Sequence, residues 1–153
     1  MKAFTYRLET LLHLREIARD KALAKYAESI NSRQYFESEL KKSELNLKSL
    51  QIQIGNQRKV YFAGFEQASF NRSILLAKEM IIDVNKKLQE AIQQEAAKKK
   101  IYLQADSAFK SLLKLKDKKH REHLYAENLK EERELEDIIG GRFVFNNLTK
   151  QKL

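Results

Sequence analysis

Two histidines and a glutamate in the C-terminal third of the chain have the spacing of a helical metal site. His120 and His123 are three residues apart and Glu127 follows one helical turn later, so the three side chains could share one side of a helix. The basic residues that directly flank His120 oppose a bound cation, however. We therefore expect surface histidines here, and no metal site.

Two other groups of residues fall short of catalytic chemistry. The stretch Gly140–Phe143 begins with a double glycine but lacks the lysine and the Ser or Thr with which a phosphate-binding loop holds nucleotide and magnesium. Paired carboxylates are abundant, but nothing on a solvated helix desolvates them for acid–base catalysis. They include Glu131, Glu132, Glu134 and Glu136. The sequence thus predicts no enzyme, no cofactor and no small-molecule substrate.

Glycine and proline, which interrupt helices, are nearly absent from this chain. It contains no proline and four glycines, with Gly55 and Gly64 near the middle and Gly140 and Gly141 near the C-terminus. Two long spans remain, and their similar lengths and short connection predict an antiparallel pair. We interpret the double glycine as a helix stop. The predicted fold class is all-α: a long two-helix antiparallel coiled-coil hairpin with a short C-terminal tail.

The predicted boundaries follow from the same glycines. We expect the first helix at approximately 5–58, ending between the two central glycines, and the second at approximately 70–139. Asn71-Arg72-Ser73 offers polar helix-starting chemistry near the second start. Residues 1–139 would form a single coiled-coil domain with its apex between the helices, followed by a tail at 140–153. We expect this hairpin to be a monomer.

Seam positions recur at alternating intervals of three and four residues in both spans, as in a coiled coil. Leu124, Leu135 and Ile138 continue the second series only after a register shift, which predicts a stutter beyond Leu112. The first predicted seam is Ala22, Tyr26, Ser29, Arg33, Phe36, Leu40, Ser43, Leu47, Leu50, Ile54, Gln57 and Tyr61. The second is Ala77, Ile81, Val84, Leu88, Ala91, Glu95, Lys98, Tyr102, Ala105, Phe109 and Leu112.

Composition agrees with a thin helical protein. Charged residues make up 33% of the chain and hydrophobic residues 42%, which is too apolar for a disordered tail and too charged for a thick globular core. The chain has no cysteine, which is compatible with a reducing compartment. It shows neither a secretory signal nor a stretch long enough to cross a bilayer. We expect a soluble, cytoplasmic protein.

The net charge of +9 is unevenly distributed along the chain. Residues 98–121 carry nine basic residues and two acids, whereas residues 122–137 carry seven acids and two basic residues. A positive stretch raises the alternative of nucleic-acid binding. No cluster of Asn and Arg has the spacing that reads base edges in a major groove, so we consider this alternative unfavoured.

The opening of the chain combines two aromatic residues, an arginine and a leucine-rich run. Residues 4–16 read Phe-Thr-Tyr-Arg-Leu-Glu-Thr-Leu-Leu-His-Leu-Arg-Glu. This block resembles the opening of the FliJ family of flagellar export proteins, whose pattern is aromatic-x-aromatic-Arg-Leu-Glu-x-Leu-Leu-x-Leu-Arg/Lys-Glu. Leu124–Asn128 and Leu135–Ile138 look like that family's closing helix, and length and two-helix layout agree. Residues Gly140–Phe145 depart from the mostly polar endings of the family.

The resemblance implies a function that the composition does not show. Members of the FliJ family form an antiparallel coiled coil similar to the gamma subunit of rotary ATPases, insert into the hexameric export ATPase, and connect it to the membrane export gate protein. A non-enzymatic stalk of flagellar protein export is therefore implied, peripheral at the inner face of the cytoplasmic membrane through its partners, with export chaperones as a further partner class. Two alternatives stay open: the equivalent stalk of a virulence-type injectisome, and a basic coiled coil that binds nucleic acid or an anionic surface.

By this analogy the helix ends enter the ATPase ring. Leucines at helical spacing more often pack in a seam than contact a partner. Arg7 and Arg15 are better probes, because a coiled coil does not need to bury them. The candidate ATPase-binding residues are Phe4, Tyr6, Arg7, Leu8, Leu11, Leu12, Arg15, Leu124, Leu135 and Ile138.

The predicted apex gathers four aromatic residues around Gly64. A short turn cannot easily bury four large rings, and exposed rings commonly mark a recognition site. An apolar stripe at the start of the second helix could extend the same surface. The candidate residues for the export gate are Tyr61, Phe62, Phe65, Phe70, Ile74, Ala77 and Ile81.

Overall fold

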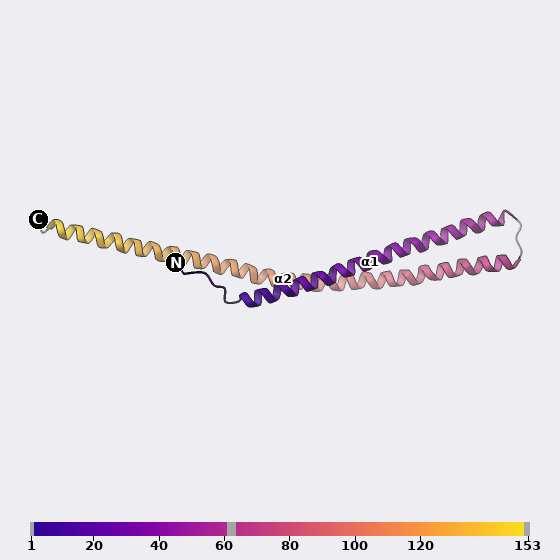
Figure 1. Ribbon diagram of the computed structural model, residues 1–153, viewed down its shortest axis with the longest axis horizontal. Coiled ribbons are helices and arrows are strands. Elements are labelled where there is room, and N and C mark those ends of the chain that lie inside the picture. The colour runs from indigo at the N-terminus through magenta and orange to yellow at the C-terminus, as the bar shows by residue number, and fades with distance from the viewer. Residues whose placement is uncertain (1, 61–63, 152–153) are drawn as a thin grey trace. The chain divides into compact units, whose positions relative to one another are not determined.

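Two long helices account for nearly all of the chain (Figure 1). The computed structural model describes residues 2–60 and 64–151, apart from the side chains of Phe65 and Gln151. Helix α1 spans Glu9–Arg58 and helix α2 spans Gly64–Gln151, and the described residues contain no strand. The helices pack against each other in opposite directions. The predicted all-α, two-helix hairpin is confirmed.

The first helix starts later than predicted, at Glu9 rather than near residue 5. The Tyr6 carbonyl accepts a hydrogen bond from the Glu9 amide at 3.1 Å, and the Leu8 carbonyl accepts one from the Leu12 amide at 2.8 Å. The acidic side chain of Glu9 suits this position, since it faces the positive end of the helix dipole. The end of α1 at Arg58 falls between the central glycines, as predicted.

The second helix extends beyond both predicted ends. It begins at Gly64 rather than near residue 70, so Asn71-Arg72-Ser73 lies inside it. It also continues through Gly140 and Gly141 to Gln151, so the expected helix stop and non-helical tail are wrong. Neither glycine has a positive φ. Glycine costs a helix about 1 kcal/mol relative to alanine without forbidding it, and helical neighbours on both sides carry the segment across.

The chain forms two compact units, which are described separately. Unit 2 comprises Ala18–Ala105, and unit 1 comprises Met1–Ile17 with Asp106–Leu153. Whether residues 1–139 act as one domain stays a prediction. Within the described residues, neither helix holds an apolar stretch long enough to span a membrane.

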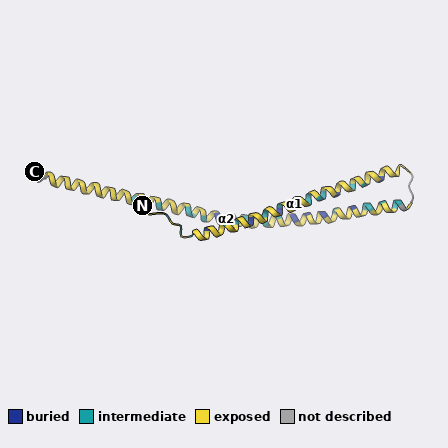
Figure 2. Ribbon diagram, in the orientation of Figure 1, coloured by how far each residue is buried: buried dark blue, intermediate teal, exposed yellow. Residues whose placement is uncertain are grey.

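Small and aliphatic side chains are buried between α1 and α2 in unit 2. Figure 2 colours the buried positions of the two helices dark blue. Every described position of the predicted seams in this unit is buried or half buried except Gln57, in the last turn of α1, and Tyr61 lies outside the described residues. No described side chain is completely shielded, because one partner helix covers a core residue from one side only. The predicted three-four register is thus confirmed. Its buried members are Ala22, Ser29, Ser43, Ile54, Ala77, Val84, Leu88 and Ala91.

Polar side chains in this seam form hydrogen bonds and ion pairs. The Ser29 hydroxyl donates to the Tyr26 carbonyl at 2.6 Å, and the Tyr26 ring stacks on the Tyr102 ring of α2 with centroids 6.1 Å apart. Arg33 forms ion pairs with Glu37 of its own helix and with Glu95 of α2. No buried polar side-chain atom of the described residues lacks a hydrogen-bond partner.

Unit 1 has a small core and a long exposed helical segment. Leu12 of α1 and Phe109 of α2 are buried in this unit. From residue 130 to residue 150 every residue of α2 is exposed (Figure 2). The predicted continuation of the seam is therefore wrong: Leu124, Leu135 and Ile138 are 39%, 57% and 55% exposed, with no helix packed over them among the described residues.

Candidate functional site

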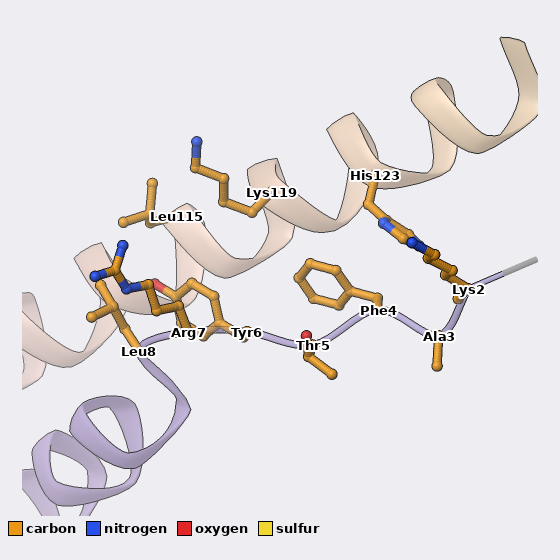
Figure 3. A pocket seen from close by; sticks show the side chains of 10 residues that line it. All are labelled: Lys2, Ala3, Phe4, Thr5, Tyr6, Arg7, Leu8, Leu115, Lys119 and His123. Atoms are coloured by element: carbon orange, nitrogen blue, oxygen red, sulfur yellow. The ribbon is translucent and has the colours of Figure 1, made fainter. Parts of the chain in front are cut away.

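Residues 2–6 run in an extended conformation along α2 in unit 1, and residues 7–8 turn into α1 (Figure 3). Residues 2–8 are here called the strap. Phe4, Tyr6 and Leu8 are half buried, whereas the intervening residues are exposed. Figure 3 shows the rings of Phe4 and Tyr6 on the side that faces α2, and Thr5 on the opposite side. This alternation has the period of two of extended chain, which the sequence analysis took for the start of a helix.

Ring contacts and hydrogen bonds hold the strap on α2, and an ion pair follows at the start of α1. The Phe4 ring packs against His120 and His123, with ring centroids 4.8 Å and 5.6 Å apart. His123 Nε2 lies 3.0 Å from the Lys2 carbonyl oxygen. The Tyr6 hydroxyl donates to the Leu112 carbonyl at 3.2 Å. Directly after the strap, Glu9 pairs with Lys116 across 2.9 Å.

A groove of about 740 Å³ runs between the strap and α2, and we call it the strap groove (Figure 3). Its lining combines apolar and aromatic side chains with basic ones, and none of the described residues that line it is acidic. Arg7 and Lys2 form no ion pair with another described residue. The lining residues are Lys2, Ala3, Phe4, Thr5, Tyr6, Arg7, Leu8, Leu115, Lys119 and His123.

The strap groove combines positive charge with apolar surface. Its cationic groups attract carboxylates or phosphates, and its rings and leucines supply apolar contact. No group of three or more His, Cys, Asp or Glu in the described part of the chain could hold a metal ion. His120 and His123, for which the sequence predicted surface positions rather than a metal site, both contact the Phe4 ring of the strap.

No known protein family, curated protein or solved structure matches this sequence.

The candidate ATPase-binding residues all belong to unit 1, but the structure gathers only some of them. The first four in the chain line the strap groove together. Leu11 and Arg15, in the first turns of α1, are exposed, whereas Leu12 is buried and cannot meet a partner without unfolding. The three candidate residues of α2 are exposed and lie outside the groove: Leu124, Leu135 and Ile138.

The candidate gate-binding residues divide differently. Tyr61 and Phe62 lie outside the described residues, and so does the side chain of Phe65. Phe70 is half buried. The adjoining stripe is part of the seam rather than an exposed face, because Ala77 is 6% exposed and its neighbours in the stripe are half buried. Those neighbours are Ile74 and Ile81.

An exposed apolar patch on this part of α2 escaped the sequence analysis. Leu75, Leu76, Met80 and Ile82 are more than half exposed. They are offset from the three-four register that defines the seam, and this offset was the signal that could have identified them. A large exposed apolar patch of this kind is typical of a contact surface.

Proposed function

We propose that this chain is a non-enzymatic stalk of the bacterial flagellar protein export apparatus, which inserts into the hexameric export ATPase and links it to the membrane export gate. The observation that carries the proposal is the block of residues 4–16, which resembles the opening of the FliJ family. In the structure the same block comprises most of the strap and the first turns of α1, with Arg7 and Arg15 exposed. A peripheral position at the cytoplasmic membrane, reached through these partners, is part of the proposal.

Two arginines give the sharpest test of the ATPase contact. Reversing their charge should remove attraction to the ring while leaving the coiled coil intact, since neither side chain is buried. The test variant is Arg7→Glu with Arg15→Glu, and the matched control is Arg72→Glu, an exposed arginine in unit 2. We expect the double variant alone to lose stimulation of the purified export ATPase. Full stimulation by a double variant of unchanged helicity would refute the contact.

The gate contact is proposed for the aromatic residues near the start of α2. Phe62→Ala with Phe65→Ala should weaken binding to the purified gate protein and leave ATPase stimulation unchanged, because a few aromatic anchors often carry most of the energy of an interface. A second variant, Leu76→Ser with Met80→Ser, tests the exposed patch beside them. If both variants keep full gate affinity, this end of unit 2 does not bind the gate.

The injectisome alternative predicts the same architecture with a different ATPase. Capture of the chain's partners from its native cell distinguishes the two, because a flagellar and an injectisome ATPase differ in sequence. Nucleic-acid binding gains no support from the basic stretch, because acidic neighbours already pair with several of its lysines. These are Lys110, Lys116 and Lys119.

A further inference from the structure

The exposed part of α2 contains a segment that is both acidic and apolar. We call residues 131–139 the acidic segment. Its carboxylates make no ion pair with any described residue, and its three large apolar side chains are each more than half exposed. The carboxylates are Glu131, Glu132, Glu134, Glu136 and Asp137, and the apolar residues are Leu135, Ile138 and Ile139.

This part of α2 has no internal source of stability. An isolated helix of about 20 residues is marginal in water even when its sequence favours helix, and most helices gain their stability from packing an apolar face. Residues 130–150 have no packing partner among the described residues and include Gly140 and Gly141, which weaken a helix further. A surface that covers the apolar side chains of this segment would therefore stabilise its helix.

The strap groove has the complementary chemistry. Lys2 and Arg7 form no ion pair with another described residue, and the described lining contains no acid. Lys119 adds a third positive charge, although it also pairs with Glu122 of its own helix at 3.4 Å. The groove therefore presents positive charge beside aromatic and aliphatic side chains. An occupant that supplies several carboxylates together with leucine or isoleucine side chains would satisfy both features.

We propose that the acidic segment of a second copy of this chain occupies the strap groove. A chain cannot fill its own groove, because α2 is one continuous helix and Lys119 and Glu131 are separated along it by about 18 Å. Two copies with antiparallel α2 helices solve this problem. Each groove then meets the partner's acidic segment, and a two-fold axis generates two identical contacts.

The proposal goes beyond the stalk function and revises the expectation of a monomer. Both surfaces of the self-contact include residues assigned above to the export ATPase: Phe4, Tyr6, Arg7 and Leu8 in the groove, and Leu135 and Ile138 in the acidic segment. Self-association and ATPase binding would therefore exclude each other. The free chain would keep its apolar residues covered until the ring displaces the second copy.

Sedimentation velocity of the full chain tests the contact without any ATPase present. We expect a monomer–dimer equilibrium that weakens as salt rises, because opposite charges form the contact. Glu134→Lys with Glu136→Lys should raise the dissociation constant at least about tenfold, as expected for charges at the centre of an interface. The matched control is Glu79→Lys with Glu90→Lys, two exposed glutamates of unit 2, which should leave it unchanged.

Charge restoration separates a specific contact from a general effect of charge. A chain that carries both Glu134→Lys with Glu136→Lys and Arg7→Glu with Lys119→Glu has reversed charges on both surfaces, and it should dimerise again. A monomer up to about 100 μM, where the mass action of even weak dimers is visible, would overturn the proposal. A dimer that is indifferent to all four reversals would overturn it too. Both results come from the chain alone, so they are independent of the ATPase stimulation assay that tests the stalk function.

Discussion

Arg33 of α1 forms an ion pair with Glu95 of α2 in the middle of the seam of unit 2. The Arg33 guanidinium also pairs with Glu37 at 2.8 Å, and the hydrogen bonds to Glu37 and to Glu95 raise its pKa. Stability from a raised pKa is lost only as pH rises through the folded-state value, which for arginine lies far above neutral. The pair therefore favours this alignment of the helices at neutral pH, because a slip would separate Glu95 from Arg33 and leave that carboxylate unpaired in a mostly apolar seam.

Removing one member of this pair should lower the free energy of unfolding more than removing both members. The side chains of Arg33 and Glu95 are 26% and 20% exposed, so Arg33→Leu alone leaves the Glu95 carboxylate without its partner and should lower the free energy of unfolding. Glu95→Leu should have a smaller effect, because Arg33 keeps its ion pair with Glu37. The double leucine variant should recover that loss. Urea unfolding of the three variants measures this coupling, and strictly additive losses would show that the pair does not act as a unit.

A charge placed in the seam should unfold unit 2, whereas the same charge on the outer face should not. Leu88 is 7% exposed and Ile82 is 70% exposed, although both belong to α2. Leu88→Asp should lower the free energy of unfolding by about 3 kcal/mol, because the carboxylate has no partner there. Leu47→Asp should act in the same way from α1. Ile82→Asp should change it by less than about 1 kcal/mol, and equal losses in circular dichroism melts would contradict the observed register.

The strap should depend on the ring of Phe4. Phe4→Ala removes the contacts with both histidines, so trypsin should cleave after Arg7 several-fold faster than in the unchanged chain, as the open state becomes more populated. Thr5→Ala is the matched control, since Thr5 is exposed and faces away from α2. Equal cleavage rates in the two variants would mean that Phe4 does not hold the strap.

The double glycine should weaken the helix that crosses it. A Cβ atom added at Gly140 or Gly141 meets nothing within 4 Å, and neither residue has a positive φ. Alanine at each position should therefore stabilise the helix locally by about 1 kcal/mol. Slower amide exchange of residues 138–148 measures the gain. Unchanged exchange in Gly140→Ala with Gly141→Ala would show that another feature limits this segment.

The seam could be predicted from sequence because burial in a helix pair follows a local period. The three-four spacing that connects Ala77 to Phe109 contains the information by itself, and even its polar members, such as Glu95, occupy the expected positions. The groove could not be predicted in the same way. Phe4 and His120, which are in contact, lie far apart in the sequence. The two-residue period of the strap covers only three side chains, which is too short to identify an extended segment.

The helix ends were the other failure, for a thermodynamic reason. A stop at Gly140 and Gly141 is the natural prediction from sequence, because glycine often ends helices. Each glycine destabilises the helix only locally, however. The length of a helix depends on the summed free energy of many neighbouring residues, because helix formation is cooperative. The sequence shows the local effect of each glycine but not this summed free energy, so it did not predict that the helix continues through residue 151.

The one-sided cover of every core residue in unit 2 determines how this unit comes apart. A globular core loses its packing in one cooperative step. In a helix pair, by contrast, the stability of each turn depends mainly on the turns before and after it. Opening can therefore start where α1 ends at Arg58 and α2 begins at Gly64, and advance one heptad at a time. Such opening would reach the ion pair between Arg33 and Glu95 before the stacked rings of Tyr26 and Tyr102, so this pair would limit how far the helices of unit 2 separate.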